Sequence, residues 1–227
     1  MVALACLRDA CGRAERFVRL GRQYLLLVGS LSVLSGCANE VPVSYVPGVS
    51  IELAEARADT IANVHYDLSF SIPSNRLEPV LGTAVVSFVL TRAGNVVFDF
   101  AQSAEHVLSV RVNGDEADYV VENEHIVIAG VPAGQANVEV EFVCGDESLN
   151  RQADFMYTLF VPDRARFAFP VFDQPDIKAR YALELEFPSD WRAVANGPRL
   201  SREMEGERVT VRFGETAFIS SYLFSFA

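Results

Sequence analysis

The stretch Asp154–Phe187 reads DFMYTLFVPDRARFAFPVFDQPDIKARYALELEF and is the densest run of aromatic residues and prolines in the chain. Its centre, Arg166–Pro175, holds three phenylalanines within six positions and ends in a stiff Asp-Gln-Pro turn. From Ala179 to Phe187 apolar residues alternate with polar ones, which is typical of a strand with one buried face. We therefore expect Arg166–Pro175 to be an aromatic turn that holds two strands and around which other elements pack.

Most of the chain beyond residue 63 shows the same two-residue alternation. The predicted strands are Val64–Ile72, Thr83–Leu90, Val96–Phe100, Val107–Val112, Tyr119–Val121, His125–Ala129, Asn137–Val143, Ala179–Phe187, Arg192–Ala195, Arg208–Phe213 and Tyr222–Phe226. Turn signals such as Asn113-Gly114 separate them at the spacing of an antiparallel protein. The sequence predicts a mainly β fold, an antiparallel β-sandwich or saddle-like sheets, with one short N-terminal helix.

That helix is expected at Ile51–Ile61, where apolar residues recur near the helical period and Ser50 is a suitable N-cap. The residues expected to face the core are Ile51, Leu53 or Ala54, Ala58 and Ile61. Arg57, like the acidic residues of this segment, is expected to face elsewhere.

Composition excludes some classes of protein. The chain has 227 residues, half of them apolar and 11% aromatic, which is enough for a sizeable core. Its formal net charge is −11. Binding to nucleic acid phosphates needs clustered Lys and Arg, so no nucleic-acid partner is expected.

The N-terminal segment has the pattern of a secretory signal. Arg13, Arg16, Arg19 and Arg22 precede the apolar run Tyr24–Leu34, which has eleven residues against the ~20 needed for a membrane-spanning helix. Leu34-Ser35-Gly36-Cys37 follows and matches the bacterial lipoprotein signal. We predict a signal peptide at 1–36 and lipidation of Cys37; the alternative is an ordinary signal with a chance cysteine.

Residues 37–49 contain two prolines and are expected to be a tether that lifts the domain off the lipid surface. Ala38, rather than Asp, after the lipidated cysteine favours the outer membrane of a Gram-negative bacterium. The predicted location is therefore the cell envelope, with the lipid anchor as the contact to the membrane.

Residue types that could carry catalysis are sparse. None of His65, His106 and His125 begins an H-E-x-x-H pair, and Cys144 is the only thiol after Cys37. We predict no metal site in this chain and expect the histidines and Cys144 to be surface or packed residues. Glutamates such as Glu139 alternate along strands and indicate a solvated face. By its own contents the chain is predicted to be inactive.

Four segments in the same order resemble the M1 zinc aminopeptidases (the aminopeptidase N family). Arg166–Ala179, RFAFPVFDQPDIKA, resembles the family signature R-x-A-F-P-C-F-D-E-P-x-x-K-A. Val64–Ile72 resembles its first strand, Trp191–Pro198 its W-x-x-x-x-N-x-P segment, and Phe213–Phe226 its F-x-x-T-x-x-x-x-x-Y-L strand. The resemblance covers about residues 50–227 and implies the family's N-terminal β domain.

The resemblance implies an exopeptidase that removes N-terminal residues from peptides with one zinc ion. In the family the zinc ligands, in H-E-x-x-H and a later Glu, and the amine-binding G-x-M-E-N segment lie in the next domain. None occurs here, so no catalytic residue is carried over, and zinc is expected only in that domain. The apolar run at Ala227 has no turn or cap, and we expect the chain to be cut before the catalytic domain on which it packs.

One family loop, T-Q-F-E-P, reaches the substrate pocket and falls on Thr158–Pro162. The resemblance thus makes Leu159, Phe160 and Val161 the candidate substrate-binding residues. Leu159 stands where the family has Gln, and Val161 where it has Glu, so a polar contact to the peptide becomes apolar. Either the preference changes, towards apolar first residues, or these residues pack at the domain interface.

Other functions stay open from the sequence. The chain could be a non-catalytic peptide-binding β-sandwich lipoprotein, a family member without its zinc site, or a structural envelope domain. Gln174 replaces the usual Glu of F-D-E-P, which keeps the hydrogen-bonding reach of the turn and loses the charge.

Overall fold

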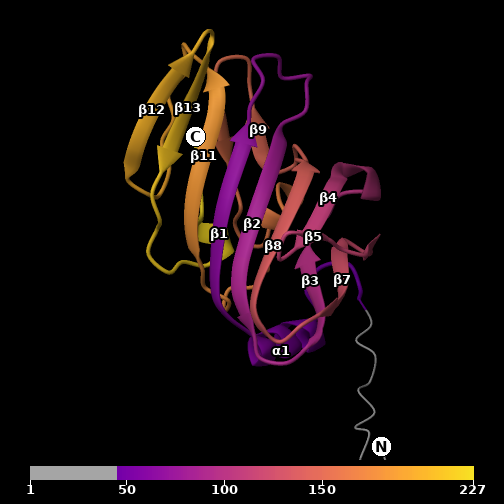
Figure 1. Cartoon of the computed structure of the whole chain (residues 1–227). Coiled ribbons are helices and arrows are strands. Elements are labelled where there is room, and N and C mark those ends of the chain that lie inside the picture. Colours follow the sequence, from indigo (N-terminus) through magenta and orange to yellow (C-terminus); the bar gives the residue numbers. More distant parts are fainter. Residues whose placement is uncertain (1–44) are drawn as a thin grey trace, which may run out of the picture. The chain divides into compact units, whose positions relative to one another are not determined.

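The computed structural model describes residues 45–227, whose strands form sheets of eight, three and two strands. The eight-stranded sheet has the order β12-β13-β11-β1-β2-β8-β4-β5, the three-stranded sheet β3-β7-β6, and the pair is β10-β9. The predicted signal peptide at 1–36, Cys37 and most of the tether lie outside the described residues. Figure 1 shows the large sheet with α1 below its lower end.

The strands are β1 Ile61–Ser71, β2 Leu81–Leu90, β3 Gly94–Asp99, β4 Val107–Val112, β5 Asp115–Glu116, β6 Tyr119–Glu122, β7 His125–Val131, β8 Gly134–Val143, β9 Leu149–Arg151, β10 Met156–Thr158, β11 Arg180–Pro188, β12 Arg199–Glu205 and β13 Arg208–Phe213. The helical segments are α1 Ile51–Thr60 and the 3-10 turns Ala104–His106, Ala165–Phe167 and Ser221–Leu223. The mainly β fold with one α-helix in residues 45–227 is confirmed.

Helix α1 begins as predicted, since the Ser50 hydroxyl accepts a hydrogen bond from the Leu53 N–H at 3.2 Å. Three expectations about its faces are wrong. Ile51 is 74% exposed and Ala58 is also exposed, so neither faces the core. Arg57 is buried, because the guanidinium finds a carboxylate partner inside the protein. The helix ends at Thr60, and Ile61 already starts β1.

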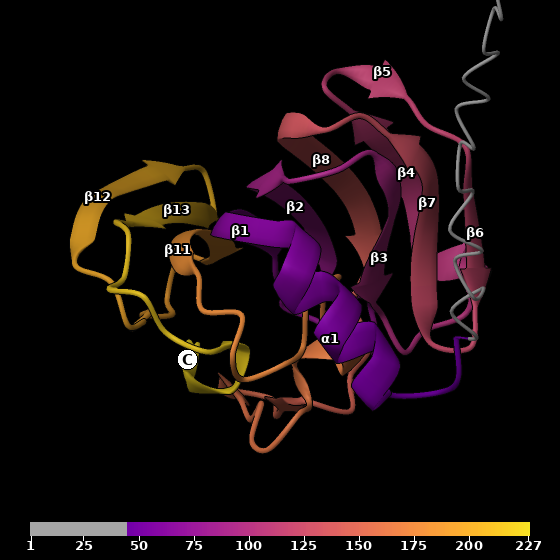
Figure 2. The same ribbon diagram turned by 90° about the horizontal axis from the view of Figure 1, so that it is seen from below.

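The aromatic turn Arg166–Pro175 packs between the sheets. Phe172 stacks on Phe98 of β3 with ring centroids 4.5 Å apart and meets Phe88 of β2 edge-on at 5.7 Å. Val171 also pairs with Asp99 at the end of β3 through two backbone hydrogen bonds. Figure 2 shows the large sheet curving around this interior, with α1 across one end. The turn is thus structural, as predicted.

Strand β1 lies at the centre of the large sheet, antiparallel to β2 and parallel to β11. Its inward residues alternate with exposed ones, as the sequence pattern predicts. Tyr66 of β1 stacks on Tyr181 of β11 at 4.9 Å. The parallel pair makes the sheet mixed rather than purely antiparallel.

Near the C-terminal end two predicted strands do not form, and one strand is present that was not predicted. Arg192–Ala195 forms no strand; its only bridge joins Ala195 to Phe226. Tyr222–Phe226 likewise contains a 3-10 turn, because Phe224 turns into the core instead of pairing. Strand β12 was not predicted, since nearly all its side chains are exposed and leave no apolar alternation.

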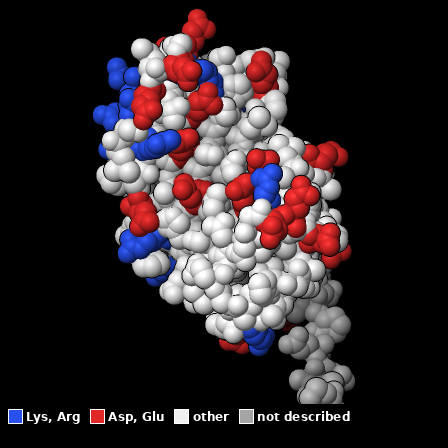
Figure 3. Space-filling model, in the orientation of Figure 1, with Lys and Arg blue, Asp and Glu red and all other residues white. Residues whose placement is uncertain are grey.

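Acidic side chains are scattered over the outer face of the large sheet, and basic side chains cluster near β12 and β13 (Figure 3). As the alternation predicts, Glu139 lies on this face, paired with Arg111 at 2.7 Å, and Glu186 pairs with Arg208 at 2.9 Å. Among the helices of residues 45–227, none is long and apolar enough to cross a membrane.

Candidate substrate-facing loop

The candidate loop, Thr158–Pro162, begins at the last residue of β10 and enters a turn at Val161. Leu159 and Val161 are 50% and 52% exposed, whereas Phe160 between them is 2% exposed. The pattern extends back to Phe155 and Tyr157, which are also exposed and stack on each other. The segment 155–161 therefore exposes four apolar side chains at alternate positions, which we call the apolar row.

Phe160 is the anchor of the loop. Its ring stacks on Phe224 with centroids 6.2 Å apart and meets Phe169 edge-on at 5.6 Å. Of the three candidate residues, Phe160 thus packs in the core and only Leu159 and Val161 point outward. The sequence alternation held this information, because MYTLFV places Phe160 on the same face as Met156.

Backbone hydrogen bonds hold both ends of the loop. Thr158 N–H donates to the Phe226 carbonyl, and the Phe226 N–H donates to Thr158 Oγ1, both at 3.0 Å. Leu159 N–H donates to the Ser148 carbonyl at 2.9 Å, and Arg164 N–H donates to the Phe160 carbonyl at 2.9 Å. These hydrogen bonds hold the backbone on both sides of Leu159.

A buried ionic cluster, which no sequence pattern indicated, lies where α1, β3 and β7 meet. Asp99 accepts two hydrogen bonds from Arg57, at 2.7 and 2.8 Å, and its Oδ1 lies 3.0 Å from His125 Nδ1. All three side chains are at most 3% exposed. Arg57 and His125 lie 42 and 26 positions from Asp99, and no local pattern connects such distant residues.

The surroundings shift the acidity of both buried aspartates. Burial alone would raise the pKa of Asp99, but the charge of Arg57 and hydrogen bonds from His125, Arg57 and the Asp173 N–H hold it below the usual value. The pKa of Asp173 is raised above its usual value, because burial disfavours the charged carboxylate and the neighbouring Asp99 charge acts in the same direction. A hydrogen bond from the Ser221 hydroxyl lowers this pKa only in part.

Gln174 joins this cluster to α1. Its amide nitrogen donates to the Ala54 carbonyl at 3.1 Å and to Asp176 Oδ1 at 3.0 Å, while its oxygen lies 3.5 Å from Arg57 Nη1. A Glu at this position could not donate the first two bonds when ionised. The amide therefore satisfies polar groups of the turn in a way that a carboxylate does not.

No group of three or more His, Cys, Asp and Glu side chains in residues 45–227 is placed to hold a metal ion. His125 is occupied by Asp99 and by the Val46 carbonyl. Cys144 is buried, as predicted, and burial raises the pKa of its thiol, which opposes formation of a thiolate. The described residues thus do not fit a zinc site.

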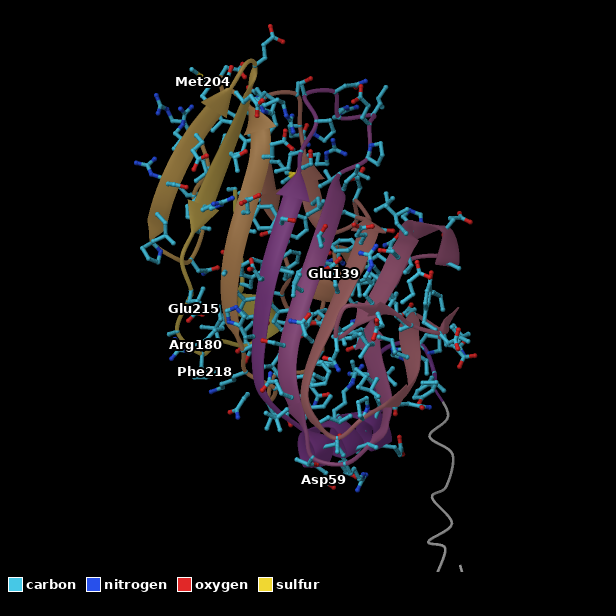
Figure 4. All side chains as sticks on the ribbon, in the orientation of Figure 1. Asp59, Glu139, Arg180, Met204, Glu215 and Phe218 are labelled. Atoms are coloured by element: carbon cyan, nitrogen blue, oxygen red, sulfur yellow. The ribbon has the colours of Figure 1, made fainter. Side chains whose placement is uncertain are left out.

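Near the loop, a cavity of about 310 Å³ is lined by Tyr157, Thr158, Val194, Asn196 and Phe226, among others. Val194 is 67% exposed and adds to the apolar row. A different group of side chains lies at the edge of β11, where Figure 4 labels Arg180, Glu215 and Phe218. Arg180 stacks over Phe218 at 4.5 Å but is itself exposed, so the group is an ordinary surface contact.

A known family of protein domains matches most of this chain. The family model of the Peptidase M1 N-terminal domain matches residues 64–223. The chain is 28% identical over 195 residues to aminopeptidase N of Streptomyces lividans, covering 78% of this chain and 22% of that protein. It is 35% identical over 127 residues to "Probable M1 family aminopeptidase 1" of Encephalitozoon cuniculi, covering 51% of this chain and 15% of that protein.

Among solved structures, the M1 zinc metallopeptidase of Deinococcus radiodurans has the same fold, with a TM-score of 0.65 at 16% identity. The match covers 74% of this chain and 41% of that one. The chain thus spans less than a quarter of the length of the two named relatives. With its four ordered motifs and the curved sheets that they form, the chain belongs to the family of Peptidase M1 N-terminal domains.

Proposed function

We propose that this chain is the non-catalytic N-terminal domain of a lipid-anchored zinc aminopeptidase that removes N-terminal residues from peptides. The observation that carries the proposal is the anchored loop Thr158–Pro162, which presents Leu159 and Val161 outward on a domain of the M1 family. Zinc and the residues that act on peptides are assigned to a downstream catalytic domain, in keeping with the M1 relatives.

The domain packs on that catalytic domain through the apolar row. Phe155, Tyr157, Leu159 and Val161 are between 44% and 52% exposed, and Val194 lies close by. Contiguous apolar side chains on a soluble surface are typical of an interaction site. Four such side chains at alternate positions of one short segment support the row as the docking face.

Within that interface Leu159 lines the first substrate subsite. Its side chain is half exposed while its backbone is held, so it offers a fixed apolar wall and no hydrogen bond. Such a wall favours peptides whose first residue is apolar.

The test compares this chain with the longer protein. Translation of the coding DNA beyond Ala227 is expected to reveal H-E-x-x-H about a hundred residues on; a stop codon there would overturn the proposal. The longer protein should hydrolyse aminoacyl-naphthylamides and lose activity with a chelator. The 227-residue chain should show no turnover with or without added zinc.

A second candidate is a peptide-binding lipoprotein without catalysis. The same apolar row and the adjoining cavity would suit an extended peptide. Saturable peptide binding by the 227-residue chain, together with a stop codon after Ala227, would favour this reading over the enzyme.

A further inference from the structure

Residues 45–48, the strap, run beside β6 into α1 and are held by three consecutive side chains of the β6–β7 hairpin (Figure 2). Each of the three binds one backbone group of the strap. Asn123 Nδ2 donates to the Tyr45 carbonyl at 2.9 Å, His125 Nε2 donates to the Val46 carbonyl at 3.0 Å, and Glu124 Oε2 accepts from the Gly48 N–H at 2.9 Å.

Glu124 also faces the candidate loop. The same Oε2 lies 3.5 Å from Arg166 Nε, an ion pair in which the Arg166 side chain is 12% exposed. Arg166 Nη1 donates to Asp163 Oδ2 at 2.8 Å and to the Asp163 carbonyl. Asp163 directly follows Pro162, so four groups in contact connect the strap with the end of the loop.

A second route leads from the strap to the same arginine. His125, which holds Val46, pairs with Asp99, and Asp99 Oδ2 accepts from the Asp173 N–H at 2.8 Å. Asp173 Oδ2 in turn accepts from the Arg166 N–H at 3.1 Å. Arg166 is therefore reached from the strap directly through Glu124 and indirectly through His125, Asp99 and Asp173.

We propose that Glu124 and Arg166 are positioning residues through which the docked strap holds the loop Thr158–Pro162. Displacement of the strap removes the N–H partner of Glu124, weakens its orientation towards Arg166 and loosens the loop. The strap forms the end of the predicted tether, so the position of the tether would change how firmly the Leu159 side chain is held in place. This last consequence rests on the proposed function, whereas the coupling itself does not.

Hydrogen exchange of backbone amides in the 227-residue chain tests the coupling. In Glu124→Gln, the Leu159 and Arg164 amides should exchange about five-fold faster, the lower end of usual coupling between sites. Amides in the β2–β8 pair should keep their rates, which shows that the fold is intact. Glu122→Gln is the matched control: it is exposed on the same hairpin and should change neither region.

Because coupling is reciprocal, a change at the loop must reach the strap. Asp163→Asn should make the Gly48 amide exchange about five-fold faster, and the exposed Asp154→Asn should not. Changes confined to the mutated side in both variants would overturn the proposal. Coupled exchange in the 227-residue chain, together with a longer protein that lacks aminopeptidase activity, would overturn the proposed function alone, because amide exchange needs no catalysis.

Discussion

At the scale of single residues, the loop and the buried cluster depend on side chains that have defined and separate tasks. Phe160 packs, Leu159 faces outward, and Asp99 gathers donors from three parts of the chain. A buried carboxylate is tolerated only when such donors surround it, and removing one member leaves the others unpaired. Substitution of Leu159 is therefore expected to change specificity, whereas substitution of Phe160 or Asp99 is expected to change stability.

Leu159→Gln in the longer protein is expected to shift specificity without loss of stability. Replacing an apolar wall by an amide should lower kcat/KM for substrates with an apolar first residue about ten-fold relative to polar ones. The ratio of the two kcat/KM values is the measurement. Leu77→Gln, 84% exposed elsewhere, serves as control. An unchanged ratio would place Leu159 at the domain interface only.

Asp99→Asn is expected to lower the free energy of unfolding at pH 7 by about 3–5 kcal/mol, because the buried Arg57 guanidinium loses its counter-ion. The pKa of Asp99 is lowered by folding, so its stabilisation is present above the ordinary value of 3.8 and is lost as pH falls through the folded pKa. Urea unfolding should therefore show a smaller difference from wild type at pH 3 than at pH 7.

The exposed Asp115→Asn on β5 is the control for that experiment and should stay within about 0.5 kcal/mol of wild type at both pH values. An equal loss for Asp99→Asn at pH 3 and pH 7 would contradict the assigned ionisation. Folding raises the pKa of the neighbouring Asp173, so the contribution of this group to folding stability is opposite to that of Asp99. It stabilises the folded state at low pH and is lost as pH rises through the folded pKa.

At the scale of elements, the extension of β10 shows how a strand can present one face and bury the other. Met156, Thr158 and Phe160 are buried, and the residues between them are exposed. The two-residue alternation of the sequence predicts this outcome, whereas the family resemblance alone groups Phe160 with Leu159 and Val161. Period two was the better guide to side-chain direction here.

Phe160→Ala is expected to destabilise the domain by about 3–5 kcal/mol, since it removes a buried ring that packs on Phe169 and Phe224. Denaturant unfolding measures the loss. Phe155→Ala removes the same ring from an exposed position of the same row and should cost no more than about 0.5 kcal/mol. Equal effects of the two variants would show that the loop is not anchored through Phe160.

At the scale of the whole molecule, the domain combines a large curved sheet, a buried ionic cluster and one apolar row. The ionic cluster and the row lie on segments from widely separated parts of the sequence. The tether leads from the domain towards the predicted lipid anchor at Cys37.

Cys37→Ser is expected to move the protein from the membrane fraction to the soluble fraction. Two acyl chains hold a protein on a bilayer, and the variant would carry neither. Fractionation of cells that express tagged protein gives the measurement. Cys144→Ser, at a buried position, should leave the protein in the membrane fraction if it folds. Membrane retention of Cys37→Ser would argue against the lipoprotein signal.

The sequence by itself determined the β class, the start of α1, most strand positions and the structural part played by Arg166–Pro175. These follow from local alternation, a capping serine and a motif, which all act between near neighbours. Only the tertiary structure decided that β1 pairs with β11 in parallel, that Arg57 is buried and that the strap reaches Arg166 through Glu124. Such contacts join residues tens of positions apart, and no local pattern specifies which partner a charge or a strand will meet.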